Sequence, residues 1–199
     1  MHDRTTSVAI EPARAAADPR KRGVALIEFA LAIPMLIILV MGTIDIGRLI
    51  QSRLIITNVS REGASVASRQ VTIDPALPNL LIASGKPLDL AGADGRVIVT
   101  RITASKDPTK PNPTIETQIV TGGLAVGSKY STGAANMGLP ANLYNYLKYD
   151  AQKGTSIISS VTMVEVAYKF RPVTPLPNFV AGMLVRDGGG MILRSTALF

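Results

Sequence analysis

An apolar run of 21 residues, from Val24 to Ile44, dominates this sequence, and Glu28 is the one charged side chain within it. As an α-helix, a run of this length extends about 31 Å, which matches the hydrocarbon core of a bilayer. The run therefore predicts a transmembrane helix. We place this helix at residues 24–46, which includes the two residues at the membrane boundary that follow the run.

The helical pattern continues beyond the apolar run. Apolar residues recur at helical spacing, and no proline occurs between Pro34 and Pro75. We therefore expect one helix from Val24 to near Arg69, about 69 Å long, whose extension at residues 47–70 lies partly against a folded head. Pro34 is expected to kink this helix, which a membrane segment tolerates.

A cleaved secretory signal peptide is the competing interpretation of the apolar run. Its apolar region would be shorter, and a small-x-small cleavage site should follow, whereas Gly42 and Gly47 form only a poor version of one. The presence of Glu28 within the run also needs an explanation, because a carboxylate in a membrane helix costs on the order of 2–3 kcal/mol. A position near the lipid headgroups explains why Glu28 is tolerated but not why it is there.

Composition removes several classes of chemistry. The 199 residues include no Cys and one His, His2, which excludes thiolate metal sites, a Cys nucleophile and a Ser-His-Asp triad outside the extreme N-terminus. The net charge of +7 is spread along the chain, without a basic run that carries interleaved aromatics. We therefore expect no nucleic-acid binding, no metal and no cofactor.

The segment before the apolar run is polar, and Pro19 argues against a helix that runs from it into the run. This segment ends in a basic triplet and a glycine: Arg20, Lys21, Arg22 and Gly23. Val24 follows, with Glu28 four residues later and Phe29 directly after it. This arrangement resembles the processing site of type IV prepilins, in which a basic leader ends in Gly and Glu occupies the fifth mature position. The Glu-aromatic pair is similar to that of Flp-type (tight adherence) pilins and pseudopilins.

Further blocks extend this resemblance. The stretch G-T-I-D-I-G-R-L at 42–49 and the stretch T-N-V-S-R-E-G-A at 57–64 resemble the TadE-like family closely. The stretch V-E-V-A-Y-K-F-R-P-V-T-P-L-P at 164–177 is similar to the end of TadE-like proteins. The resemblance covers residues 20–69 well and 160–199 moderately.

The resemblance implies that this chain is a substrate and not an enzyme. A membrane aspartyl prepilin peptidase would cut the Gly23–Val24 bond at the cytoplasmic face, and glycine lets the scissile segment extend into a narrow site. Glu28 would then be available to pair with the new Val24 amine, within its own chain or on a neighbouring subunit. Arg20, Lys21 and Arg22 would stay cytoplasmic, with the head in the periplasm and the helix in the bacterial inner membrane. The implied partners are other pilins or pseudopilins and the Tad inner-membrane assembly proteins.

The remainder of the chain predicts an α+β, pilin-like fold, in which the long helix continues into a small head with a short antiparallel sheet. We divide the chain into a leader (1–23), a transmembrane helix (24–46), a helix extension (47–70) and a head (71–199). Strands are expected at 96–103, 115–120, 161–171 and 191–199, a helix at 141–152, and loops at 74–95 and 122–140. In the strand at 161–171, Val164, Val166, Tyr168 and Phe170 share one face, and Glu165 and Lys169 lie on the other.

Three groups of polar residues are expected to be unremarkable. Asp45 and Arg48 should form a weak surface salt bridge. Four tyrosines should form a half-buried rim of the head: Tyr130, Tyr144, Tyr146 and Tyr149. Three aspartates fit no calcium loop and should be exposed turn residues: Asp89, Asp94 and Asp107.

The sequence therefore favours a minor pseudopilin of a Flp/Tad-type system that helps initiate or assemble adhesive pili, either within the fibre or from the membrane. The chain is longer than major Flp pilins, which are little more than the helix. The alternative is an unprocessed single-pass envelope protein whose head binds a partner or ligand. A membrane-anchored periplasmic enzyme ranks far behind, because no spacing of Ser or Asp residues supports one.

Overall fold

A computed structural model describes residues 19–70, 72–173 and 190–199, and the side chains of 19–22 and Ala25 are outside this description. The chain separates into two units, Met1–Met41 and Gly42–Phe199. The helix α1 (Pro19–Ser68) contributes to both units. Each unit is described below on its own.

The long helix is confirmed, and it starts earlier than expected. It begins at Pro19, so the basic triplet is already helical. A proline at the first position of a helix loses no hydrogen bond, and its fixed φ suits a helical start, which is why Pro19 begins α1 instead of preventing it. The helix also continues through Pro34 without a break.

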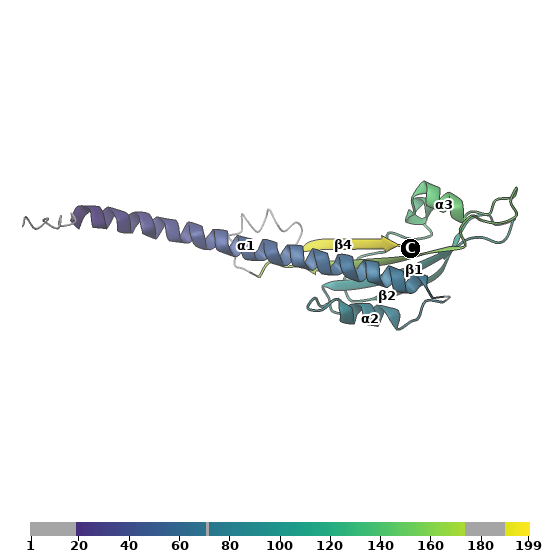
Figure 1. Cartoon of the computed structure of the whole chain (residues 1–199), viewed down its shortest axis with the longest axis horizontal. Helices are drawn as coiled ribbons and strands as arrows, with labels where there is room; N and C mark the ends of the chain where they lie inside the picture. The colour runs from purple at the N-terminus through teal and green to yellow at the C-terminus, as the bar shows by residue number, and fades with distance from the viewer. Residues whose placement is uncertain (1–18, 71, 174–189) are drawn as a thin grey trace, which may run out of the picture. The chain divides into compact units, whose positions relative to one another are not determined.

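The head contains a four-stranded antiparallel sheet in the order β2-β1-β3-β4. The strands are β1 (Gly95–Thr103), β2 (Thr114–Thr121), β3 (Ser160–Phe170) and β4 (Met191–Leu198), and all four expected strands are confirmed. Figure 1 shows the sheet beside the C-terminal part of α1. The fold is therefore α+β, with the central strands β1 and β3 contributed by segments about sixty residues apart.

One face of the sheet packs against α1. The helix contributes small and apolar side chains at helical spacing, and Ile56, Val59, Ala64 and Ala67 are each at most 2% exposed. Their partners on the sheet include Val97 and Val99 of β1 and Val164, Val166 and Phe170 of β3. Ser60 Oγ of α1 also lies 2.8 Å from Ser195 Oγ of β4. The expected apolar face of β3 is thus the face that the helix covers.

The expectation of a loop throughout 74–95 is wrong, because residues Leu77–Ser84 form the helix α2. Pro78, which in the sequence indicates a loop, occupies the first turn of this helix, where proline is favoured. Leu77 and Leu81 of α2 join the core between α1 and the sheet. At Gly63 of α1, a Cβ atom would lie 2.6 Å from Leu81 Cδ1, so this glycine permits the two helices to approach closely.

The opposite face of the sheet is covered by the segment 122–140, a turn at Ala135–Gly138 and the short helix α3 (Ala141–Leu147). The loop at 122–140 is confirmed apart from this turn, and α3 ends five residues before the expected Gln152. Tyr130 is 2% exposed and belongs to this second core, so its placement on a half-buried rim is wrong. Tyr146 is 44% exposed and does lie at the surface.

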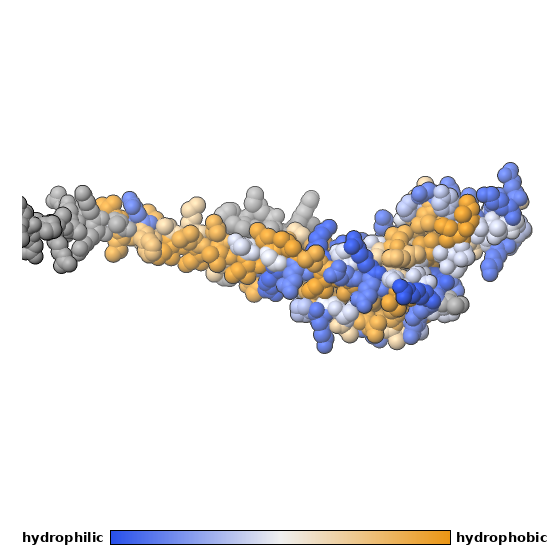
Figure 2. Space-filling view, in the orientation of Figure 1, coloured by the Kyte–Doolittle hydropathy of each residue, from blue (hydrophilic) through white to orange (hydrophobic). Residues whose placement is uncertain are grey.

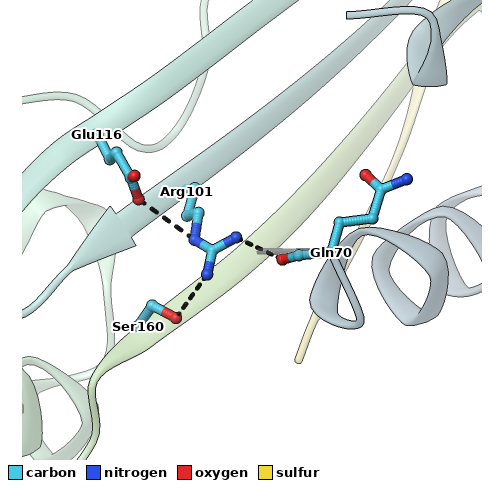
Figure 3. Close-up of polar contacts among 4 residues, drawn as sticks. All are labelled: Gln70, Arg101, Glu116 and Ser160. Carbon is cyan, nitrogen blue, oxygen red and sulfur yellow. Dashed lines mark hydrogen bonds and ion pairs between the residues drawn. The ribbon is translucent and has the colours of Figure 1, made fainter. Parts of the chain in front are cut away.

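The end of α1 is fastened to the sheet by Arg101 of β1 (Figure 3). Its Nη1 donates to the Gln70 carbonyl at 2.7 Å, and its Nη2 donates to Ser160 Oγ at 3.3 Å. Its Nε lies 3.3 Å from Glu116 Oε2, an ion pair whose geometry does not make a hydrogen bond. A helix leaves its last carbonyls without partners, and here a guanidinium from the sheet supplies one just beyond the helix end.

Candidate functional site

The first part of α1 presents apolar side chains to its surroundings. The large apolar residues between Val24 and Val40 are at least 39% exposed, and Leu31 and Met35 exceed 70%. An 18-residue stretch of this helix, within Leu26–Ser68, has a mean hydropathy of 2.3, and none of its residues is buried. Figure 2 shows these side chains as a continuous apolar band along the helix. Among the described residues, this is the one helix long and apolar enough to cross a membrane.

The predicted processing site lies near the start of this helix. Gly23 and Val24 are both exposed, and a Cβ atom at Gly23 would meet nothing within 4 Å. Arg20, Lys21 and Arg22 occupy the preceding turn of the helix, and their side chains lie outside the described residues. The Gly23–Val24 bond is therefore open to approach but helical in conformation.

Glu28 and Phe29 are also exposed on α1. Val24 and Glu28 are four residues apart, so they lie on one side of the helix with a rise of about 6 Å between them. Within the described part of the chain, no hydrogen bond or ion pair is recorded for Glu28. The helix thus groups the predicted site residues from Gly23 to Phe29 within about two turns.

Asp45 differs from its expectation. It is 1% exposed, and its Oδ1 accepts a hydrogen bond of 3.1 Å from the backbone N–H of Val173. The prediction of a surface salt bridge with Arg48 is therefore wrong in placing Asp45 at the surface. A buried carboxylate needs hydrogen-bond donors, and the chain that leaves β3 supplies one. The G-T-I-D-I-G-R-L block marked this position in the sequence, but periodicity did not reveal its burial.

A second buried carboxylate lies on the far face of the sheet and was missed in the sequence. Glu165 of β3, expected on a polar face, is 7% exposed. It accepts hydrogen bonds from the Ser128 hydroxyl and from the Lys129 backbone N–H, the latter at 3.0 Å. Burial and, secondarily, the charge of Glu165 raise the pKa of the Tyr130 hydroxyl. This cluster fastens the segment 122–140 to the sheet.

The three aspartates that could suggest a cation site are separated by their local contacts. Asp89 Oδ1 accepts from the Gly92 N–H, and Asp107 Oδ1 accepts from Thr109. Asp94 Oδ1 lies 2.6 Å from Arg171 Nη2. Across residues 19–70, 72–173 and 190–199, no group of three or more His, Cys, Asp or Glu side chains could hold a metal ion.

These observations define a class of protein: an α+β head built on the second half of a long N-terminal helix whose first half is suited to a membrane. Comparison with known families adds one finding: residues 23–65 match the family model described as TadE-like protein. The match begins at Gly23 and lies entirely within α1. It confirms the resemblance drawn from the sequence and supports involvement with Tad/Flp pilus systems in general. Comparison with curated proteins gives no match, and comparison with solved structures gives none either.

Proposed function

We propose that this protein is a minor pseudopilin of a Flp/Tad-type pilus system, matured by a prepilin peptidase that cuts between Gly23 and Val24. The observation that carries the proposal is the position of Gly23, Val24 and Glu28 in a TadE-like segment at the start of a membrane-competent helix. The mature chain begins with Val24, and its head lies in the periplasm. The protein acts as a substrate and assembly component and not as an enzyme.

The helical conformation around Gly23 bears on how the peptidase acts. A protease binds its substrate in an extended conformation, so the first turns of α1 must unwind before the bond is cut. Glycine favours this, because it is about 1 kcal/mol less favourable than alanine inside a helix. It also removes the Cβ atom from the scissile residue. Gly23 therefore assists both the unwinding and the fit.

The role of Glu28 follows from charge in a membrane. After cleavage, the Val24 amine and the Glu28 carboxylate lie one helical turn apart near the membrane boundary. A carboxylate that has no partner in lipid is unfavourable by on the order of 2–3 kcal/mol. Pairing with an amine, on the same chain or on a neighbour, offsets this penalty and favours one stagger between packed subunits.

The first experiment determines the N-terminal sequence of the protein isolated from membranes, in strains with and without the prepilin peptidase. We expect a chain that starts at Val24 only when the peptidase is present. An intact leader in both strains would overturn the proposal and favour a permanently anchored envelope protein with a partner-binding head.

The second experiment tests Glu28 in assembly. Glu28→Gln is expected to leave cleavage at Gly23 intact and to reduce pilus formation, because the neutral amide cannot pair with the amine. Glu62→Gln provides the matched control, since it makes the same substitution at an exposed position of the same helix beyond the predicted span. Normal piliation in the Glu28→Gln strain would contradict the assembly role without contradicting the processing site.

A further inference from the structure

A small cleft of about 130 Å³ lies beside α1, just beyond the predicted end of the membrane span. Its lining includes Arg48, Gln51 and Ser52 from α1, Tyr168 and Phe170 from the end of β3, and Arg171, which follows β3 directly. The α1 residues follow helical spacing and therefore share one side of the helix. The cleft belongs wholly to the unit formed by Gly42–Phe199.

The charge of this cleft is positive. Two guanidinium groups line it and no carboxylate does. Within the part of the chain that the structure describes, Arg48 forms no ion pair. Arg171 is 58% exposed and contacts Asp94 through Nη2, which leaves its other N–H donors available. The two guanidinium groups therefore suit an anion with several oxygen acceptors.

The depth of the cleft matches that of lipid headgroups. Arg48 follows the last residue of the apolar run, Ile44, by four positions, or about 6 Å along the helix. The headgroup layer on each side of a bilayer is roughly 5–7 Å thick. On the opposite side of α1, Ile46, Ile50 and Leu54 remain 50%, 56% and 60% exposed. Lipid can therefore surround one side of the helix at the depth where its other side forms the cleft.

We propose that this cleft binds the phosphate of an anionic phospholipid in the leaflet on the side of the head. Arg48 and Arg171 hold the phosphate oxygens. The inference rests on the membrane-spanning part of the proposed function and names a ligand for it. Its consequence is that a bound lipid holds the base of the head at the bilayer surface.

The test uses the full chain, first shown to resist alkaline carbonate extraction from membranes and then purified in a zwitterionic detergent. Phosphatidylglycerol or phosphatidylcholine is added, and retained lipid is measured by quantitative mass spectrometry. We expect selective retention of phosphatidylglycerol, reduced about fivefold by either Arg48→Gln or Arg171→Gln, because one juxtamembrane arginine contributes about that factor. Arg53→Gln is the control for loss of a basic residue, since Arg53 is exposed on the same helix about 7.5 Å further along it and is absent from the cleft lining.

Each other outcome overturns the inference in a distinct way. Equal losses in Arg48→Gln, Arg171→Gln and Arg53→Gln would indicate general attraction to basic residues. Displacement of the lipid by millimolar inorganic phosphate would indicate a site for a soluble anion. Asp94→Asn removes the partner of Arg171 without removing the cation, so weaker retention in that variant would show that the Arg171 effect is structural. Failure of carbonate resistance would contradict the membrane span itself, and so the proposed function.

Discussion

Replacing Arg101 by methionine tests whether the guanidinium holds the end of α1 to the sheet. The side chain is 14% exposed, so methionine can fill its volume while removing its donors. Two hydrogen bonds are lost, a short one to the Gln70 carbonyl and a longer one to Ser160. A hydrogen bond that involves a charged group contributes about 1.5–3 kcal/mol, and the longer bond should contribute little. The Glu116 carboxylate is 43% exposed, so its ion pair adds at most about 1 kcal/mol.

The expected loss is therefore about 2–3 kcal/mol in the free energy of unfolding of the head. At about 2–4 °C per kcal/mol for a domain of this size, Tm should fall by roughly 5–10 °C. Thermal unfolding of the full chain in detergent, followed by circular dichroism, measures this change. Hydrogen exchange should also speed up selectively at the last amides of α1, near Ala67 and Ser68, because that end loses its attachment.

Two variants control the interpretation. Glu116→Gln removes only the ion pair and should cost less than about 1 kcal/mol. Arg101→Lys keeps the charge but loses the planar fork, so its cost should fall between the other two. If Arg101→Met were no more destabilising than Glu116→Gln, or if exchange accelerated uniformly across the head, the attachment of α1 through the Gln70 carbonyl would be refuted.

Three further predictions concern the packing and ionisation of the head. Gly63→Leu should destabilise it by about 1–3 kcal/mol, measured by denaturant unfolding, because a Cβ atom there already meets the buried side chain of Leu81; an unchanged midpoint would contradict the close approach of α1 and α2. Gly122→Ala should cost more than about 1 kcal/mol, since Gly122 has φ of +103° and a Cβ atom would lie 2.4 Å from the Gly95 carbonyl oxygen; thermal melts would detect this, and an unaltered Tm would count against that geometry. Because the pKa of Tyr130 is raised in the folded head, the folded head binds more protons than the unfolded chain above about pH 10. The stability that Tyr130 contributes to the head should therefore be fully present below that pH and be lost as pH rises through the folded pKa. Tyr130→Phe should flatten this alkaline loss in a pH series of melts, and an identical slope in both proteins would exclude Tyr130 as its source.

Much of the fold follows from local sequence patterns. The long helix, the four strands and the apolar face of β3 each depend on a run length or a period that neighbouring residues express. The exceptions at Pro19 and Pro78 share one cause. Proline ends a helix when it lies inside one but begins a helix when it lies in the first turn, and the sequence pattern alone did not separate these cases.

The polar residues of the head could not be placed in the same way. Glu165 and Tyr130 occupy positions that a lone strand or loop would leave half exposed. They are buried because β3 is a central strand and the segment 122–140 covers its far face. The cleft that contains Arg48 and Arg171 is similar, since these two residues line one surface only when the end of β3 lies beside α1.

The amino-acid order thus suffices for the membrane-length helix, the motif from Gly23 to Phe29 and the set of strands, because each is encoded within a few consecutive turns or residues. The three-dimensional arrangement adds the burial of Asp45, the support of Glu165 and the attachment of Arg101. Their hydrogen-bond partners lie 128, 36 or 37, and 31 or 59 positions away in the chain. A polar group is stable in a core only when such distant donors or acceptors reach it, so its role is established by packing and not by local pattern.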